Sequence, residues 1–204
     1  MADAMIIKPF FAAQGLLPPS TFLEDLFTIT APTFQNLAGG TLTPSMSTLK
    51  YVAAANVPAN FGWDIGSEKS TILMLFHFQR FRSSDTAIFF TDTLPAAAEI
   101  PDGSYLVDTA IGLYILYKKA GGVFTPLVTV NTIDNGTPTL DSGMALYYDD
   151  ATDRLVVFIR TSPECWFPII DTTDASFTTM RYAGIRFNGG QTWFINTPFA
   201  IYTN

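Results

Sequence analysis

The sequence predicts an all-β protein: an antiparallel two-sheet jelly-roll sandwich with an extended N-terminal arm. Apolar and polar residues alternate with a period of two over most of the chain, which is typical of strands. Clusters of Gly, Asn, Asp and Pro interrupt this alternation about once every ten residues, the spacing of a sandwich. We therefore expect an arm over residues 1–20 and a single β-sandwich domain over residues 21–204.

The predicted arm is apolar but cannot form a continuous helix, because Pro9, Gly15 and Pro18 interrupt it. Fully extended, it would reach about 60 Å. Its apolar side chains are the predicted assembly contacts: Ile6, Ile7, Phe10, Phe11, Leu16 and Leu17. Two alternatives stay open, a strap across the protein's own domain and a tether into a neighbouring subunit. Thr21 and Glu24 have the spacing of a capping box, which predicts a helical turn after the arm.

The strongest predicted strand is Ser70–Phe81, whose apolar residues fall on both faces and therefore indicate a central position in a sheet. Thr86–Thr91 is expected to be its neighbour. A hairpin turn is predicted at Ala120–Gly122. The other expected strands are Phe27–Thr30, Leu49–Ala53, Ser104–Val107, Ile111–Lys118, Val123–Val130, Gly143–Asp149, Arg154–Arg160, Phe177–Phe187, Gln191–Asn196 and Phe199–Thr203.

Charge is distributed unevenly along the chain. Residues 4–63 hold four ionisable side chains, residues 64–186 hold 24, and residues 187–204 hold none. A soluble protein normally covers its surface with charged groups. We interpret the charge-poor ends as surfaces that another molecule covers.

Composition excludes several classes of protein. The net charge is −7 and no basic run exceeds Lys118–Lys119, so the chain lacks the basic stripe that nucleic-acid binding needs. No apolar run approaches the ~20 residues of a membrane helix. Asp3 and Pro9 do not fit a signal peptide, so we expect synthesis in the cytoplasm without export. The single cysteine, Cys165, excludes an intramolecular disulfide and a cysteine-rich metal site.

Three segments resemble concanavalin A-like sandwiches, the fold of legume lectins and laminin-G-type modules. Residues 145–157, ALYYDDATDRLVV, resemble a hairpin in which a strand ending in Tyr-Asp is followed by a short turn and Leu-x-Val. Residues 182–187 resemble the Gly-Phe strand of that fold, and residues 192–202 resemble its closing strands. The resemblance implies two curved antiparallel sheets of about six or seven strands each. It also makes glycan binding one expected function, although a fold does not fix a function.

The chain departs from the catalytic and metal-binding members of that fold. None of its four Glu residues begins a Glu-x-Asp loop of the kind with which legume lectins hold calcium and manganese. No strand carries the paired carboxylates that retaining glycosidases need. The only histidine, His77, lies in the most apolar strand, where a hydrogen-bonded core residue is the simpler interpretation. We therefore predict that the protein is not an enzyme and needs no cofactor.

Two groups of residues are candidate binding sites. Asp149, Asp150 and Asp153 crowd one turn and are calcium candidates, with turn capping by Asp side chains as the alternative interpretation. Tyr147, Tyr148 and Asp150 are glycan-binding candidates, because aromatic rings stack on sugars and carboxylates accept hydrogen bonds. Core packing is the alternative for both rings.

Two functions follow from these observations. The first is a structural assembly protein of a virion, such as a bacteriophage capsid cement or decoration protein or a tail-associated subunit. It would act through contacts with copies of itself or with capsid or tail proteins, as the apolar arm and the charge-poor ends suggest. The second is a carbohydrate-binding, lectin-like module, which includes a receptor-binding part of a virion. The apolar arm and the charge-poor ends favour the first.

Overall fold

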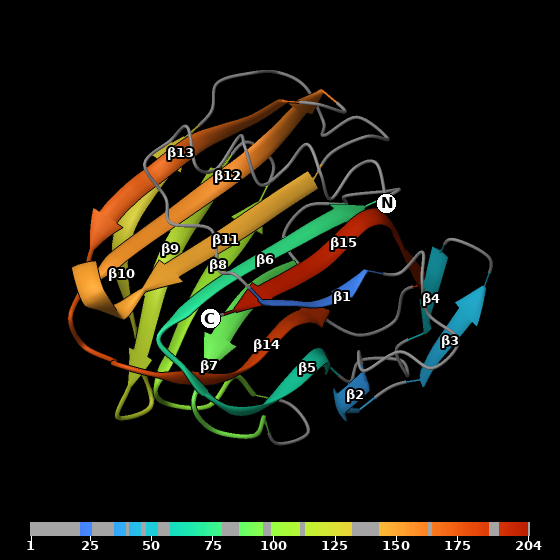
Figure 1. The fold of residues 1–204 in the computed structure, drawn as a ribbon, viewed down its shortest axis with the longest axis horizontal. Coiled ribbons are helices and arrows are strands. Elements are labelled where there is room, and N and C mark those ends of the chain that lie inside the picture. The colour runs from blue at the N-terminus through green and yellow to red at the C-terminus, as the bar shows by residue number, and fades with distance from the viewer. Residues whose placement is uncertain are drawn as a thin grey trace.

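The computed structural model describes residues 21–25, 35–39, 41–45, 48–52, 58–78, 86–95, 99–110, 113–131, 143–162, 165–187 and 192–203. These residues form fifteen strands in two antiparallel sheets that face each other (Figure 1). Sheet A runs in the order β13 (Cys165–Thr173), β12 (Arg154–Ser162), β11 (Gly143–Asp149), β6 (Thr71–Phe78), β15 (Thr192–Thr203), β4 (Thr48–Val52) and β3 (Thr41–Ser45), and β1 (Thr21–Asp25) also pairs with β15. Sheet B runs in the order β10 (Val123–Asn131), β9 (Leu113–Ala120), β8 (Ser104–Ala110), β7 (Thr86–Thr91), β14 (Met180–Phe187), β5 (Ala59–Lys69) and β2 (Gln35–Ala38). The predicted two-sheet antiparallel sandwich is confirmed.

The main core lies between the two sheets and is built by the alternation seen in the sequence. Every second residue of a strand faces inward, so Phe61 and Trp63 of β5 meet Leu146 and Tyr148 of β11 in one buried cluster. Burying an apolar side chain of this size contributes about 1.5–3 kcal/mol. This core therefore accounts for much of the stabilisation of the sandwich.

The strand β6 is central, as its sequence predicts. It lies between β11 and β15, and both of its faces are buried. Ile72 and Met74 face the main core, whereas Leu73 and Leu75 face outward and are at most 2% exposed. The outward pair belongs to a second apolar cluster on sheet A, with Ala145, Tyr147, Val156, Phe158 and Trp166.

Two hairpins have the turns that the sequence predicts. Gly121 and Gly122 connect β9 to β10 with φ values of 57° and 77°, which is the left-handed geometry of a two-residue hairpin turn. A 3-10 turn over Asp150–Thr152 connects β11 to β12, and Asp153 ends it with a φ of 55°. Asn and Asp tolerate this conformation better than other residues with side chains.

Several elements differ from the prediction. Thr21–Asp25 is the strand β1 and not a helical turn, because its backbone pairs with β15. Thr86–Thr91 is β7, but it pairs with β8 and β14 in sheet B and not with β6. Residues 192–203 form one strand with an irregularity between Asn196 and Ala200, where two strands were expected.

Four strands, β2, β3, β5 and β13, have no counterpart in the prediction, and two of them contain residues that are unfavourable in strands. The strand β5 contains Gly62 and Gly66, which weaken the apolar alternation. The strand β13 contains Pro168, which reads as a strand breaker. Pro168 is tolerated because β13 lies at the edge of sheet A, where an unpaired side of the strand needs no N–H donor.

The charge-poor C-terminal segment is part of the protein's own sheet. The strand β15 pairs with β6 on one side and with β4 and β1 on the other, and Ile201 and Thr203 are completely buried. Neighbouring strands of the same chain therefore pair with its backbone and cover Ile201 and Thr203, and coverage of its other face by another molecule stays a prediction. The predicted arm, residues 1–20, and the predicted strand Phe27–Thr30 lie outside the described residues.

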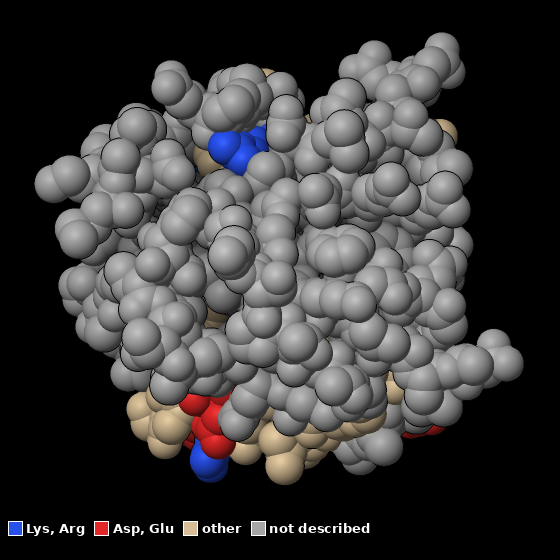
Figure 2. All heavy atoms as spheres, turned by 90° about the vertical axis from the view of Figure 1, so that its right-hand side faces the viewer, with Lys and Arg blue, Asp and Glu red and all other residues tan. Residues whose placement is uncertain are grey.

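The described part of the chain contains no helix long and apolar enough to cross a membrane. On the face shown in Figure 2, the charged side chains among the described residues appear near the upper and lower margins.

Candidate functional site

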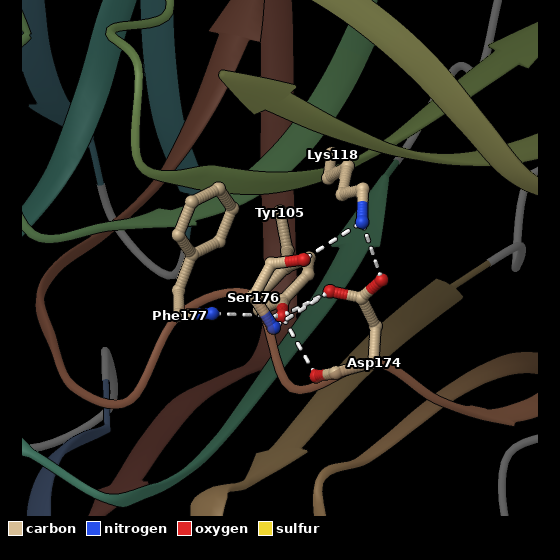
Figure 3. Close-up of polar contacts among 5 residues, drawn as sticks. All are labelled: Tyr105, Lys118, Asp174, Ser176 and Phe177. Carbon is tan, nitrogen blue, oxygen red and sulfur yellow. Dashed lines mark hydrogen bonds and ion pairs between the residues drawn. The ribbon is translucent and has the colours of Figure 1, made fainter.

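One end of the sandwich is closed by a hydrogen-bonded group that we call the end clasp: Tyr105, Lys118, Asp174, Ser176 and Phe177 (Figure 3). The Tyr105 hydroxyl lies 2.8 Å from both the main-chain oxygen and Oδ1 of Asp174, and it accepts a hydrogen bond from Phe177 N at 3.3 Å. Lys118 Nζ donates to Asp174 Oδ2 at 2.8 Å and to Ser176 Oγ at 2.7 Å. Asp174 to Phe177 lie between β13 of sheet A and β14 of sheet B, so the clasp ties this crossover to β8 and β9.

The clasp also connects the two sheets. The Tyr148 hydroxyl of sheet A donates to Phe177 O at 2.8 Å, and the Tyr105 ring of sheet B lies 5.8 Å from the Tyr148 ring and 4.9 Å from the Phe177 ring.

Burial acts to raise the pKa of Asp174, but hydrogen bonds from Lys118, Ser176 and Tyr105 outweigh it and lower that pKa to about 2. Burial and the hydrogen bond to Asp174 raise the pKa of Tyr105 well above its usual value. The polar groups of the clasp hydrogen-bond to one another, which indicates a structural role for the clasp.

A row of polar and aromatic residues crosses the outer face of sheet B at the same end of its strands. Strand register places one residue from each of six adjacent strands in this row, which we call the outer row. Its members are Asp64, Tyr182, Thr91, Ser104, Lys119 and Phe124. They face away from the main core, because the residues beside them, such as Trp63, Phe90 and Tyr105, belong to that core.

The middle of the outer row is closed. Thr91 and Ser104 are completely buried, and their hydroxyls hydrogen-bond to Thr93 O at 3.4 Å and to Pro101 O at 2.7 Å. Both acceptors lie in the connection between β7 and β8. Ile100 of the same connection packs in a buried cluster with residues of the outer face of sheet B. The outer row is therefore accessible at its two ends.

At the β5 end, Arg181 and Asp64 form a two-bond ion pair at the surface. Arg181 Nε donates to Asp64 Oδ1 at 3.0 Å, and its second nitrogen donates to Oδ2 at 3.1 Å. The hydrogen bonds from Arg181 lower the pKa of Asp64. The Arg181 guanidinium also lies 5.3 Å from the centre of the Tyr182 ring. Tyr182 is only 6% exposed, so this ring offers no open face.

At the β10 end, an aromatic ring remains open to solvent. The Phe124 side chain is 42% exposed, its ring centre is 4.9 Å from Lys119 Nζ, and the Tyr117 ring lies 6.2 Å away at 76°. Lys119 is 6% exposed, donates to Ile100 O at 2.7 Å and lies 3.8 Å from a carboxylate oxygen of Glu99. This end combines an exposed ring with polar groups held in place, an arrangement suited to binding an amphipathic ligand such as a sugar.

A further polar pair lies on the same outer face, four residues along the strands from Asp64 and Tyr182. Asn60 and Arg186 are paired in register on β5 and β14. Asn60 Nδ2 donates to Glu99 O at 3.3 Å, but Asn60 Oδ1 and Arg186 Nε are buried without a hydrogen-bond partner. Burial lowers the pKa of Arg186. We call these two residues the unsatisfied pair.

The predicted calcium candidates act as turn residues. Asp149 Oδ1 accepts from Ala151 N and from Thr71 Oγ1 at 3.3 Å each, and Asp149 Oδ2 accepts from Thr152 Oγ1 at 2.7 Å. Asp149 is thus the N-cap of the 3-10 turn, the alternative that the sequence left open. Within the described residues, no group of three or more His, Cys, Asp and Glu side chains could hold a metal ion, so Asp149, Asp150 and Asp153 do not converge on one.

The predicted glycan-binding tyrosines are both buried, as the alternative of core packing requires. Tyr148 is 0% exposed and faces the main core, and Tyr147 is 1% exposed within the second cluster on sheet A. Adjacent residues of a strand point to opposite faces, so the two rings cannot form one platform. Asp150 starts the turn beyond them and is partly exposed.

The other residues singled out in the sequence hold positions in strands. The backbone of His77 lies in β6, opposite Gly143 of β11 and Asn196 of β15, and Cys165 begins β13. Phe124, Lys119 and Asp174 were not among the site residues predicted from the sequence. The one available signal was the pair Lys118–Lys119 in a strand, because period-two alternation sends the two side chains to opposite faces.

Comparison with known proteins identifies the fold. No protein-family model matches the sequence, and no curated protein sequence matches it. Solved structures do match. The Ca2+/Man3GlcNAc-bound exoplasmic/lumenal domain of VIP36 is 15% identical, with 85% of this chain and 84% of that chain covered and a TM-score of 0.65.

Two further structures agree with this match. The lectin-like defense protein arcelin-5 from Phaseolus vulgaris is 11% identical, with 89% of this chain and 96% of that chain covered and a TM-score of 0.59. The carbohydrate binding module CBM66 from Bacillus subtilis is 12% identical, with 85% and 98% covered and a TM-score of 0.57. At such identities the likeness establishes the fold alone, and the chain has the concanavalin A-like β-sandwich fold of the legume-lectin type.

Proposed function

We propose that the protein is a carbohydrate-binding, lectin-like module and that the outer face of sheet B carries its binding surface. The observation that carries this proposal is the open aromatic end of the outer row, where Phe124 is half-exposed beside the anchored amine of Lys119. Sugars present both apolar C–H faces and hydroxyls, so a ring next to fixed polar groups suits them.

The fold adds support. The solved structures that match nearly the whole chain include a mannose-oligosaccharide complex, a carbohydrate binding module and a lectin-like protein. Those ligands belong to those proteins, and a shared fold hosts many functions. The fold therefore raises the expectation of glycan binding, and the exposed ring of Phe124 supports the proposed location.

A glycan array probed with the full chain tests this proposal. We expect specific binding to at least one glycan class, in calcium and again in a chelator, so that any calcium requirement is measured separately. Tyr148→Ala and Asp150→Ala test the site that the sequence predicted. Failure to bind across neutral, sulfated and uronic-acid glycans would contradict the proposal.

An assembly role, including that of a virion component made in a host cytoplasm, is the second candidate. One observation favours it: Phe167 on the edge strand β13 is 58% exposed, and exposed aromatic residues are enriched at protein–protein interfaces. Size-exclusion chromatography of the full chain beside a variant lacking residues 1–20 tests it. We expect the full chain to self-associate, and two monomers of equal stability would argue against assembly.

A further inference from the structure

Among the described side chains, four large apolar residues are exposed: Leu94, Val123, Phe124 and Phe167. Two of them are aromatic, and they lie on different sheets. Phe124 belongs to β10 of sheet B and Phe167 to β13 of sheet A. Of these two rings, Phe124 is the one that lies beside a cation and a second ring, Lys119 and Tyr117.

The surroundings of Phe124 hold it in place before a ligand arrives. Lys119 is buried, and its amine is fixed by the hydrogen bond of 2.7 Å to Ile100 O. The turn that precedes Phe124 is fixed as well, because Gly122 N donates to both carboxylate oxygens of Asp102, at 2.9 and 3.0 Å. A prearranged ring loses little conformational freedom on binding, which favours affinity.

The charge around this ring is negative where it meets solvent. The amine of Lys119 is shielded, whereas the Glu99 side chain, 3.8 Å from it, is 80% exposed. Asp102 is exposed too, at the turn beside Phe124. Exposed carboxylates accept hydrogen bonds from sugar hydroxyls but repel sulfate and uronate groups.

Resting on the proposed function, we propose that Phe124 is the stacking residue of a subsite for neutral sugars. In this subsite a hexose places a C–H face on the Phe124 ring. Its hydroxyls lie toward Glu99 and the edge of Tyr117, and the carboxylates Glu99 and Asp102 exclude anionic glycans.

Isothermal titration with neutral, sulfated and uronic-acid oligosaccharides tests the subsite, with ligands drawn from the glycan array. We expect neutral ligands to bind and Phe124→Ala to weaken them about tenfold or more, the change that corresponds to loss of one aromatic contact. Phe124→Tyr is expected to retain binding, because it keeps the ring. Phe167→Ala is the matched control, since it removes an exposed ring from the other sheet.

A second variant tests the selection by charge. Glu99→Gln keeps the side chain's size but removes its charge and one acceptor of the sugar hydroxyls, so we expect it to lower the ratio of neutral to anionic ligand affinity at low salt.

The outcomes separate the two proposals. Unchanged binding in Phe124→Ala, or loss in Phe167→Ala instead, overturns the subsite while glycan binding stands. A preference of the wild-type protein for anionic glycans overturns the neutral-sugar assignment. Absence of binding to every ligand overturns the proposed function itself. Circular dichroism of each variant establishes that the fold is retained.

Discussion

The end clasp and the unsatisfied pair are both polar groups attached to sheet B, and they differ in whether their polar atoms have hydrogen-bond partners. In the clasp, Asp174 accepts from Lys118 and Ser176 and meets the Tyr105 hydroxyl. In the unsatisfied pair, Asn60 Oδ1 and Arg186 Nε have no partner. A buried polar group without a hydrogen bond costs about 1–3 kcal/mol, whereas a satisfied one contributes about 1 kcal/mol. The comparison indicates that the clasp stabilises the fold and that the unsatisfied pair does not.

The largest effect is expected from Asp174→Ala. The substitution leaves Lys118 without its carboxylate partner and removes an acceptor of Ser176 N, so we expect the free energy of unfolding to fall by about 2–4 kcal/mol. Urea denaturation measures this change. Asp171→Ala is the matched control, because Asp171 is also paired with a cation, Arg154, but its side chain is 51% exposed. We expect the control to lose less than about 1 kcal/mol. Equal losses in the two variants would contradict the claim that the clasp stabilises the fold more than an exposed ion pair does.

Acid is expected to weaken the clasp. The pKa of Asp174 is lowered to about 2, so the folded state binds its proton less readily than the unfolded chain does. The stabilisation is therefore fully present above about pH 4, the usual carboxyl pKa, and is lost as the pH falls toward 2. We expect the stability lost from Asp174 in acid to be about 1–2 kcal/mol. Urea denaturation at pH 6 and pH 3 measures it, and Asp174→Asn should reduce the difference. A difference that persists unchanged in Asp174→Asn would assign the acid sensitivity to other groups.

A smaller loss is expected from Tyr105→Phe. This change keeps the ring that contacts Tyr148 and Phe177 but removes the hydroxyl that bonds Asp174 and Phe177 N. We expect a loss of about 1–2 kcal/mol, measured by thermal and urea unfolding. Tyr117→Phe, on the outer face of the same sheet, serves as the control and should change stability by less than about 0.5 kcal/mol. If the clasp does not stabilise the fold, the two variants would have the same free energy of unfolding.

The smallest effect is expected from Asn60→Ala, although Asn60 is only 1% exposed. The variant loses the hydrogen bond to Glu99 O but also removes the unsatisfied carbonyl oxygen, so the two contributions oppose each other. We expect stability to stay within about 1 kcal/mol of the wild type. A loss above about 2 kcal/mol in urea denaturation would show that Asn60 stabilises the fold in the same way as the clasp residues.

Part of the candidate site could be anticipated from the sequence. The hairpin that presents Phe124 follows from Gly121 and Gly122, because their freedom to take positive φ sets a tight turn. The exposure of Phe124 could not be anticipated, since it depends on what covers the outer face of sheet B. The same limit explains why the sequence indicated Tyr147 and Tyr148 as candidates and not Phe124. An aromatic residue in an alternating strand gives the same sequence pattern whether its face of the sheet is covered or exposed.

The sequence by itself determined the all-β class, the central place of β6 and the turns at Gly121–Gly122 and Asp150–Thr152, because these depend on alternation and local backbone preference. The tertiary structure decided which sheet β7 joins, and it brought Tyr105 to Asp174 across 69 positions of the chain. Alternation specifies that a strand has a buried face but not which strand lies beside it. That choice comes from packing between distant segments, which no local pattern contains.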